Sequence, residues 1–260
     1  MKKLTITAAI VLYNEHKPTL QKTINSFLAI PESKKLFLID NSKNDSLKEL
    51  ANHPDIEYYY SDKNLGFGKA HNTITSKIVG VSDYHLVLNP DVSFNPKTIS
   101  SLISQLKKDH NLSMIAPKVL FPNKKHQYTA RKYPAFFDLI IRRLNCFKKR
   151  IYNHEYRYLN LSESLYVDYL TGCFQLYNTT DFVKIGGFDE RYFLYMEDVD
   201  ICKKIDLIGK KKLYYPKVTI THVLKQGSSK SFKLFFYHLS SAIKYFVKWN
   251  IFPPKNKVNS

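Results

Sequence analysis

The sequence is poor in cysteine and has no long apolar run. Its three cysteines, Cys146, Cys173 and Cys202, are too few and too widely spaced for a disulfide framework or a zinc cluster, which favours a reducing compartment. No segment approaches the ~20 apolar residues that a membrane-spanning helix needs. The apolar run from Leu4 to Tyr13 is short and has no small-residue cleavage site after it. We expect this run to be a buried strand.

Two nucleotide-binding fingerprints are also missing. Neither Gly-x-Gly-x-x-Gly nor Gly-x-x-x-x-Gly-Lys-Ser/Thr occurs, which counts against dehydrogenases and nucleotide hydrolases. A different glycine-containing loop spans residues 64–72 and leads into a predicted helix. Its glycines, Gly66 and Gly68, are expected to let the backbone approach a ligand.

Acidic residues are few compared with basic ones. There are 22 Asp and Glu against 40 Lys and Arg, which gives a formal net charge of +18. Such a charge favours an anionic partner, whether a nucleic acid, a nucleotide diphosphate or an acidic membrane surface, and does not choose among them. The 260 residues contain no internal repeat and no low-complexity linker, so we predict one domain.

The first half of the chain alternates strand-like apolar runs with segments of helical periodicity. The strand-like runs are residues 6–12, 36–39, 56–60 and 84–88. The helical segments that follow the first three runs are residues 18–30, 46–52 and 70–78. This order predicts an α/β domain with a doubly wound, mostly parallel sheet. In such sheets, ligands bind beyond the carboxyl ends of the strands.

Polar clusters follow three of these strands: Tyr13-Asn14-Glu15, Asp40-Asn41-Ser42 and Asn89-Pro90-Asp91. Asp40 is placed to accept a hydrogen bond from the N3–H of a pyrimidine, although an Asx turn explains the same residues. Asp91 offers a carboxylate oxygen to a divalent cation that bridges a diphosphate, and a plain turn is its alternative.

The second half is less regular. We predict a helix at residues 100–107 and strands at residues 114–119, 166–177, 212–215 and 218–222. Between them, residues 121–164 lose periodicity and gather positive charge. His222 follows the last strand, where a lone histidine is more often structural than a ligand.

Two basic segments have amphipathic patterns, at residues 136–150 and 231–249. The second has an apolar stripe of Phe232, Phe235, Leu239, Ile243, Phe246 and Trp249. Each segment either packs on the core or lies on an anionic membrane surface.

The acid-rich stretch at residues 186–202 combines a glycine pair with aromatic residues and acids. Counting back from Ile201 at helical spacing places Asp198 on the inward face of a helix. Asp200 then points elsewhere, within reach of Lys203 and Lys204. A core-facing carboxylate is costly unless it is used, so Asp198 is the candidate for chemistry. The alternative is an acidic first turn that complements the helix dipole.

These motifs together resemble those of an inverting glycosyltransferase of family 2 with the GT-A fold, particularly the bacterial rhamnosyltransferases that build O-antigen or related surface polysaccharide. The resemblance covers essentially the whole chain. Besides the three strand-end clusters, it is carried by Asn64-Leu65-Gly66-Phe67-Gly68 with Asn72, Arg131-Lys132-Tyr133-Pro134, Thr171-Gly172-Cys173-Phe174, the stretch at residues 186–202, and His222 with Gly227-Ser228-Ser229.

The resemblance implies roles for individual residues. Asp198 matches the general base, and Glu197 either orients the acceptor or caps the helix. Asp91 matches a position that binds Mg²⁺ or Mn²⁺, and His222 completes the metal shell in some relatives. Asn89 stands where many relatives have an acid, which puts the need for metal in doubt. The implied donor-binding residues are Tyr13, Asn14, Asp40, Asn41, Asn64, Gly66, Phe67, Asn72, Asn89, Asp91 and Arg131. Arg131 is equally explained as a solvated charge. The implied acceptor-binding residues are Gly172, Cys173 and Tyr195.

The expected protein is a peripheral enzyme on the inner face of the bacterial cytoplasmic membrane. It would transfer L-rhamnose from dTDP-rhamnose to a lipid-linked saccharide. Within one domain, residues 1–120 would bind the nucleotide, residues 121–230 would hold the acceptor and the catalytic residues, and residues 231–260 would form an amphipathic helix and tail. A UDP-hexose donor is the first alternative. A nucleic-acid-binding module is the second, and the absence of a recognisable nucleic-acid motif counts against it. The oligomeric state stays open.

Overall fold

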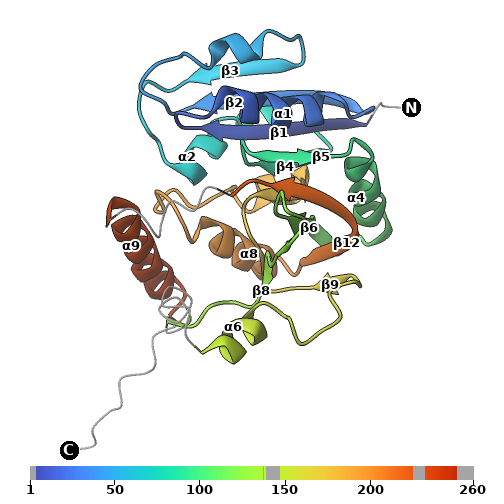
Figure 1. The fold of residues 1–260 in the computed structure, drawn as a ribbon, viewed down its shortest axis with the longest axis vertical. Helices are drawn as coiled ribbons and strands as arrows, with labels where there is room; N and C mark the ends of the chain where they lie inside the picture. Colours follow the sequence, from blue (N-terminus) through green and yellow to red (C-terminus); the bar gives the residue numbers. More distant parts are fainter. Residues whose placement is uncertain (1–3, 137, 139–146, 225–231, 251–260) are drawn as a thin grey trace, which may run out of the picture.

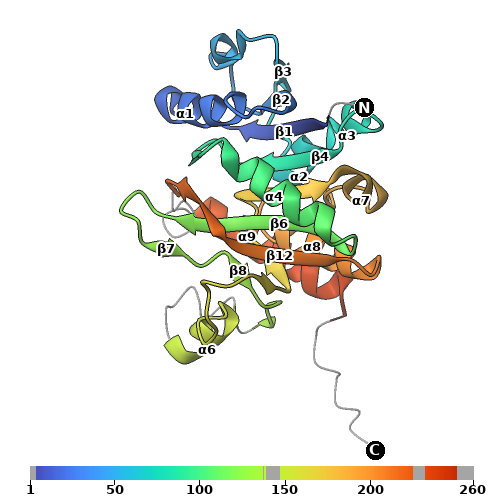
Figure 2. The same ribbon diagram turned by 90° about the vertical axis from the view of Figure 1, so that its right-hand side faces the viewer.

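The computed structural model describes residues 4–136, 138, 147–224 and 232–250. Its main sheet has the strand order β3-β2-β1-β4-β11-β6-β12-β5 (Figure 1). Helices cover both faces. One core cluster includes Leu20 and Phe27 of α1 (Lys17–Leu28), and the other includes Ile201 of α8 (Glu197–Leu207). Figure 2 shows the molecule turned by 90°, with α4 in front of the strands.

The parallel half forms as expected from its apolar runs. Its strands are β1 (Thr5–Leu12), β2 (Ser33–Asp40), β3 (Ile56–Tyr60) and β4 (Tyr84–Leu88), all parallel to one another. The helices between them are shorter than expected. Residues 46–52 form only a 3₁₀ turn, η1 (Lys48–Ala51), and residues 70–78 divide into α2 (Phe67–Asn72) and α3 (Thr75–Ile78).

The second half differs from the prediction in its strands. Residues 166–177 are three strands, β9 (Leu165–Tyr166), β10 (Tyr169–Leu170) and β11 (Phe174–Asn178), rather than one. Gly172 and Cys173 lie in the connection between β10 and β11. By contrast, the two strands predicted at residues 212–222 are one irregular strand, β12 (Lys211–His222).

Strand β11 makes the sheet mixed. It inserts antiparallel between β4 and β6 (Leu112–Leu120), while β12 is parallel to β6 and antiparallel to β5 (Val92–Phe94). The remaining elements are α4 (Lys97–Lys108), β7 (His126–Gln127), β8 (Ala130–Arg131), α6 (Lys148–His154) and α7 (Thr179–Lys184). Cys173 and Cys202 are buried free thiols.

The C-terminal helix α9 (Phe232–Lys248) has two apolar faces rather than the single predicted stripe. One face packs on the core through Ala242, Tyr245 and Phe246. The other is exposed and consists of Phe232, Phe236, Leu239, Ile243 and Val247, which we call the outer stripe. Both interpretations of this helix therefore describe a part of it. The other amphipathic segment, residues 136–150, lies largely outside the described residues, as do Gly227, Ser228 and Ser229.

Asp200 corrects a further prediction. It is not a surface partner of Lys203 and Lys204 but is fully buried. Its carboxylate accepts hydrogen bonds from Tyr192 Oη at 3.0 Å, Lys248 Nζ at 2.8 Å and Trp249 Nε1 at 2.8 Å. Because Lys248 and Trp249 lie at the end of α9, Asp200 anchors that helix to α8.

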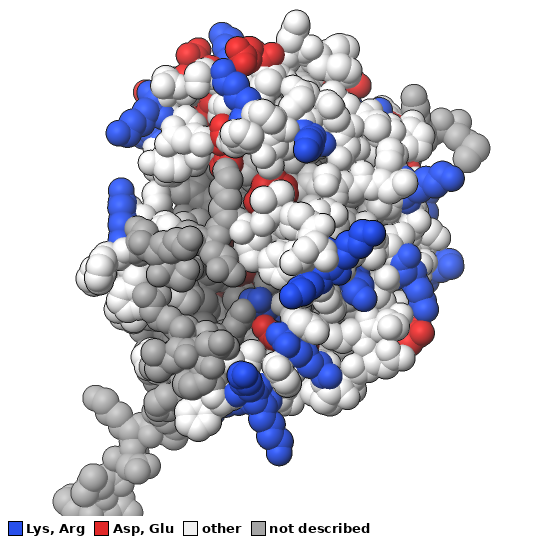
Figure 3. Space-filling model, in the orientation of Figure 1, with Lys and Arg blue, Asp and Glu red and all other residues white. Residues whose placement is uncertain are grey.

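No helix in the described ranges is long and apolar enough to cross a bilayer. Lysine and arginine side chains are spread over the face drawn in Figure 3, where acidic side chains are fewer.

Candidate active site

Two cavities lie next to each other near the carboxyl ends of the strands. The acid cavity, of about 620 Å³, is lined by residues that include Asn89, Arg131, Gly172, Cys173, Tyr195, Glu197, Asp198 and His222. The tyrosine cavity, of about 570 Å³, is lined by residues that include Tyr13, Asn41, Asn64, Gly66 and Tyr237. Phe67 and Leu194 line both cavities, so the two adjoin.

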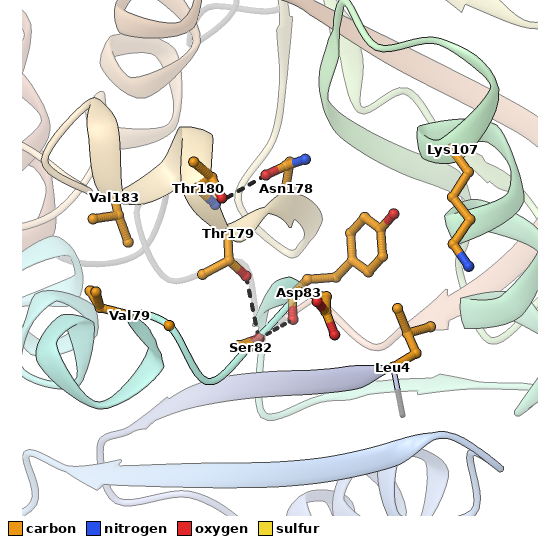
Figure 4. A pocket seen from close by; sticks show the side chains of 11 residues that line it. Leu4, Val79, Ser82, Asp83, Lys107, Asn178, Thr179, Thr180 and Val183 are labelled. Carbon is orange, nitrogen blue, oxygen red and sulfur yellow. Dashed lines mark hydrogen bonds between the residues drawn. The ribbon is translucent and has the colours of Figure 1, made fainter. Parts of the chain in front are cut away.

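A third hollow lies at the opposite end of the sheet (Figure 4). It is lined by residues that include Leu4, Ser82, Asp83, Lys107 and Thr179. Leu4 precedes β1 and Asp83 precedes β4, so this hollow faces the amino ends of the parallel strands. It contains none of the predicted site residues, and ligands of such sheets bind at the other end.

The start of helix α8 places two acids in the acid cavity. Tyr195 and Met196, which precede it, both have φ of 68°, a left-handed conformation that side chains other than glycine rarely adopt. This turn directs Glu197 and Asp198 into the cavity. The amides of Gly172 and Val199 donate to Asp198 Oδ2 at 3.2 Å and to Oδ1 at 2.9 Å. Such backbone strain is typical of functional sites.

The two acids differ in their surroundings. Burial and the charge of Asp198 raise the pKa of Glu197 to about 8, and its Oε2 has no hydrogen-bond partner among the described residues. Burial also raises the pKa of Asp198, but the nearby Arg131 and the two amide donors oppose this rise. Asp198 is therefore the acid that ionises first, and Glu197 keeps its proton near neutral pH.

Asp91 and His222 meet beside the acid cavity because β5 pairs with the end of β12. His222 Nε2 lies 3.2 Å from Asp91 Oδ1, and its Nδ1 lies 3.0 Å from Gln127 Oε1. Burial disfavours the imidazolium, but hydrogen bonds to Asp91 and Cys173 outweigh burial and raise the pKa of His222 to about 10.

This pair fits a divalent cation only in part. A carboxylate oxygen and an imidazole nitrogen at this separation can share one ion once His222 releases its proton, but Mg²⁺ and Mn²⁺ need further oxygen ligands. In the described part of the chain, no group of three or more His, Cys, Asp or Glu is arranged to hold a metal. A diphosphate and water would have to supply the remaining ligands.

The tyrosine cavity gathers several of the predicted donor residues. Tyr13 is exposed at its mouth. Asn41 Nδ2 donates to the Gly66 carbonyl at 3.2 Å, and Asn64 Oδ1 accepts from Gly66 N at 2.9 Å. Asn14 lies beside this group, and its backbone N–H donates a hydrogen bond to Ser42 Oγ at 2.8 Å. These bonds hold the 64–68 loop against the end of β2.

Asp40 and Asn72 line neither cavity. Asp40 is fully buried, and its carboxylate accepts from Ser42 N at 2.8 Å, which is the contact of the Asx-turn alternative, and from Tyr58 Oη at 2.7 Å. The side-chain amide of Asn72 exchanges two hydrogen bonds with the Phe188 backbone, at 2.8 and 3.0 Å. Asn72 thereby holds the glycine pair that precedes Phe188.

The glycines of the 64–68 loop pack against the 186–202 stretch. A Cβ on Gly66 would lie 2.3 Å from the Phe193 carbonyl oxygen, and one on Gly68 would lie 2.8 Å from Phe188 Cβ. These glycines therefore allow a close approach of the 186–202 stretch, and Gly66 also lines the tyrosine cavity. The contact joins the nucleotide-side loop to the segment that carries Asp198.

Several residues that line the cavities were not predicted. Arg157, Glu155, His126 and Thr129 line the acid cavity. Phe193 and Tyr237 line the tyrosine cavity. Four of these six residues come from residues 121–164, where the sequence has no periodicity that would orient a side chain. The positive charge of that segment was its only signal.

The chain matches a known family and several known proteins. Residues 7–186 match glycosyl transferase family 2. Rhamnosyltransferase WbbL of Escherichia coli (strain K12) is 28% identical over an alignment of 257 residues, which covers 95% of this chain and 95% of its own. N-acetylglucosaminyl-diphospho-decaprenol L-rhamnosyltransferase of Mycobacterium tuberculosis (strain ATCC 25618 / H37Rv) is 27% identical over 79% of this chain and 72% of its own.

Two solved structures share the fold. GalNAc-T7, solved with UDP, GalNAc and Mn²⁺, has a TM-score of 0.67 and 17% identity over 86% of this chain. Mannosyltransferase PcManGT from Pyrobaculum calidifontis, solved with GDP-Man and Mn²⁺, has a TM-score of 0.62 and 14% identity over 94% of this chain. The chain spans 44% and 64% of the lengths of these two solved chains. The likenesses confirm the expected GT-A fold.

Proposed function

Because the chain belongs to glycosyltransferase family 2, we propose that this enzyme transfers L-rhamnose, with inversion, from dTDP-rhamnose to a lipid-linked saccharide of bacterial surface polysaccharide synthesis. Two curated relatives named as rhamnosyltransferases support the choice of sugar. The observation that carries the proposal is the position of Asp198, held by the Gly172 and Val199 amides in a cavity that adjoins the tyrosine cavity.

Asp198 acts as the general base. It removes the proton from the acceptor hydroxyl as that oxygen attacks the anomeric carbon of the donor sugar, in one displacement that releases the nucleoside diphosphate. Its neighbour Glu197, which keeps its proton near neutral pH, donates a hydrogen bond to a substrate oxygen. Arg131, beside Asp198, favours the ionised form of the base.

Asp91 and His222 are the residues that would hold Mg²⁺ or Mn²⁺. A bound cation would stabilise the negative charge of the leaving diphosphate. Two solved GT-A neighbours that contain Mn²⁺ support this assignment. Binding of Mn²⁺ in the presence of dTDP, followed by electron paramagnetic resonance, tests it. Asp91→Asn should weaken this binding, and unchanged binding would remove Asp91 from the metal site.

The donor nucleotide binds in the tyrosine cavity. Tyr13 offers an aromatic ring at the mouth of this cavity, and the loop fixed by Asn41 and Asn64 forms one wall. A UDP-hexose would fit the same cavity, because these contacts select the nucleotide more strongly than they select the sugar. Incubation of the purified protein with a panel of nucleotide sugars, Mg²⁺ or Mn²⁺ and a lipid-linked saccharide decides between the donors. We expect turnover of dTDP-rhamnose, and turnover of a UDP-hexose alone would overturn the choice of donor.

The acceptor lipid implies contact with a membrane surface. The outer stripe of α9 exposes large apolar side chains, and Lys233 is exposed on the same helix. A net charge of +18 favours an anionic leaflet. We place the enzyme on the inner face of the cytoplasmic membrane, with the outer stripe toward the lipid.

A further inference from the structure

We propose that Ser241, in the C-terminal helix α9, positions the two acids of the acid cavity by holding the backbone turn that leads into them. The inference rests on the proposed function, which it deepens by naming a positioning residue outside both cavities. Ser241 is buried and lines neither the acid cavity nor the tyrosine cavity. Its Oγ donates a hydrogen bond to the Leu194 carbonyl oxygen at 2.8 Å, between residues 47 positions apart in the chain.

The turn that follows Leu194 is strained. Tyr195 and Met196 lie between Leu194 and the two acids, and each has φ of 68°. This left-handed conformation is unfavourable for residues other than glycine, because the Cβ atom comes too close to the following carbonyl oxygen. Two such residues in succession persist only where the surrounding structure holds them in place. The turn therefore depends on contacts on both of its sides.

Both sides of the turn are held by hydrogen bonds. After the turn, the Met196 carbonyl accepts a helical hydrogen bond from Asp200 N at 2.9 Å. Before the turn, Ser241 fixes the Leu194 carbonyl, and with it the planar peptide group that leads into Tyr195. Removal of the Ser241 hydroxyl would leave the turn held at the α8 side and would let its strain relax at the other.

Relaxation of the turn would move both acids. Glu197 and Asp198 follow the turn directly, and Asp198 is held by the Gly172 amide at 3.2 Å and the Val199 amide at 2.9 Å. The bond to Gly172 joins α8 to a different segment, so it depends on where the turn places the start of the helix. A displacement of about 1 Å can slow a reaction roughly 10²-fold. Ser241 therefore supports turnover without contact with the substrate.

Two further residues of α9 support the same segment. The ring centroid of Tyr237 lies 4.6 Å from that of Phe193, and the ring of His238 lies 5.1 Å from that of Tyr195. Helical spacing brings Tyr237, His238 and Ser241 to one side of α9. This helix is therefore a support for the catalytic turn as well as a wall of the tyrosine cavity.

Kinetics of the full chain test the assignment, with the nucleotide sugar that the donor panel identifies. Ser241→Ala should lower kcat roughly tenfold to a hundredfold and leave the donor dissociation constant within about twofold. Ser241→Thr, which keeps the hydroxyl, should restore most of the turnover. Ser241→Cys, whose thiol is a weak donor, replaces Ser241→Ala if that variant does not fold.

A double variant separates positioning from a purely structural role. If Ser241 acts through Asp198, Ser241→Ala should cause little further loss of kcat in an Asp198→Asn background, because the effects of residues that act as a unit are not additive. An equal loss in both backgrounds would overturn the proposal.

Hydrogen exchange tests the same claim without transfer, so that absence of rhamnosyl transfer would count against the proposed function alone. In Ser241→Ala, the Gly172 and Val199 amides, which hold the base, should exchange roughly tenfold faster than in the wild type. The matched control is Lys244→Met, because Lys244 Nζ also donates to a carbonyl of this segment, that of Arg191, at 2.8 Å, but is exposed. Unchanged exchange at the two amides in Ser241→Ala would overturn the proposal.

Discussion

Glu197 and Asp198 are adjacent in the chain but are suited to different tasks. Asp198 receives two backbone hydrogen bonds and lies near Arg131, whereas Glu197 is buried with one oxygen unpaired among the described residues. Two acids with separated pKa values provide a base and a proton-bearing group in one cavity. This difference supports our proposal that Glu197 does more than cap the helix.

The raised pKa of Glu197 predicts how stability depends on pH. The pKa of an unperturbed glutamic acid is 4.5 and that of Glu197 in the folded protein is about 8, so its favourable contribution is complete below pH 4.5 and is lost as the pH rises through 8. Glu197→Gln removes this loss. We expect the melting temperature of Glu197→Gln, relative to that of the wild type, to increase between pH 5 and pH 9. A difference that is constant over this range would show that Glu197 ionises normally.

Helical spacing could place Asp198 but not Asp200. Helical spacing relative to Ile201 correctly placed Asp198 on the inward side of its helix, where it lines the acid cavity. The same counting placed Asp200 among nearby lysines, because helical spacing describes only neighbours on one helix. Its true partner Lys248 lies 48 residues later in the chain, and Trp249 lies 49 residues later. Contacts between distant segments are not visible in local periodicity.

At the scale of elements, α9 connects the anchor at Asp200 to the tyrosine cavity. The last turn of this helix bonds to Asp200 and Asp189, and its first turns supply Lys233, Leu234 and Tyr237 to the cavity wall. A substitution at Asp200 should therefore also alter the wall of the tyrosine cavity.

Substitution of Asp200 tests this connection. Asp200→Asn leaves a partly buried Lys248 with a weaker partner, and we expect a loss of about 3 kcal/mol in the free energy of unfolding. We also expect faster hydrogen exchange in α9 and a raised donor KM. The control is Lys244→Met, because Lys244 lies on the same helix but is exposed and bonds only to the Arg191 carbonyl among the described residues. Equal effects of the two substitutions would contradict the anchor.

The elements themselves were predictable where burial decides them. The apolar runs that became β1 to β4 have no stable place other than the interior of a sheet. Strand β11 was not predictable as a separate antiparallel strand, because its direction depends on β4 and β6 rather than on its own residues. The lining of the acid cavity by Arg157 was likewise hidden, since it follows from the path of an irregular segment.

At the scale of the whole molecule, charge and the outer stripe of α9 act together. In our proposal, a net charge of +18 would draw the protein to an anionic surface, and the exposed apolar side chains would then insert. Neither feature alone holds a protein firmly on a bilayer. Their combination predicts binding that depends both on salt and on the apolar side chains.

Binding to vesicles measures both contributions. In a flotation assay with phosphatidylglycerol vesicles, we expect binding that weakens as salt is raised. Phe232→Ser combined with Phe236→Ser should weaken it by about tenfold or more, since burial of each ring is worth roughly 1.5–3 kcal/mol. Val81→Ser is the control, because Val81 is 55% exposed but lies at the opposite end of the sheet. If the control and the double variant bind equally, the outer stripe does not contact lipid.

The assignment of Asp198 as the base of a sugar transfer is the centre of this account. The measurement that tests it most directly is transfer by Asp198→Asn, made together with the dissociation constant of the nucleotide-sugar donor. Asparagine keeps the shape and an oxygen for the Gly172 amide but cannot take a proton. We predict that kcat falls by roughly 10³-fold while donor affinity stays within about twofold of the wild type. Near-normal turnover, or loss of donor binding in place of turnover, would contradict it.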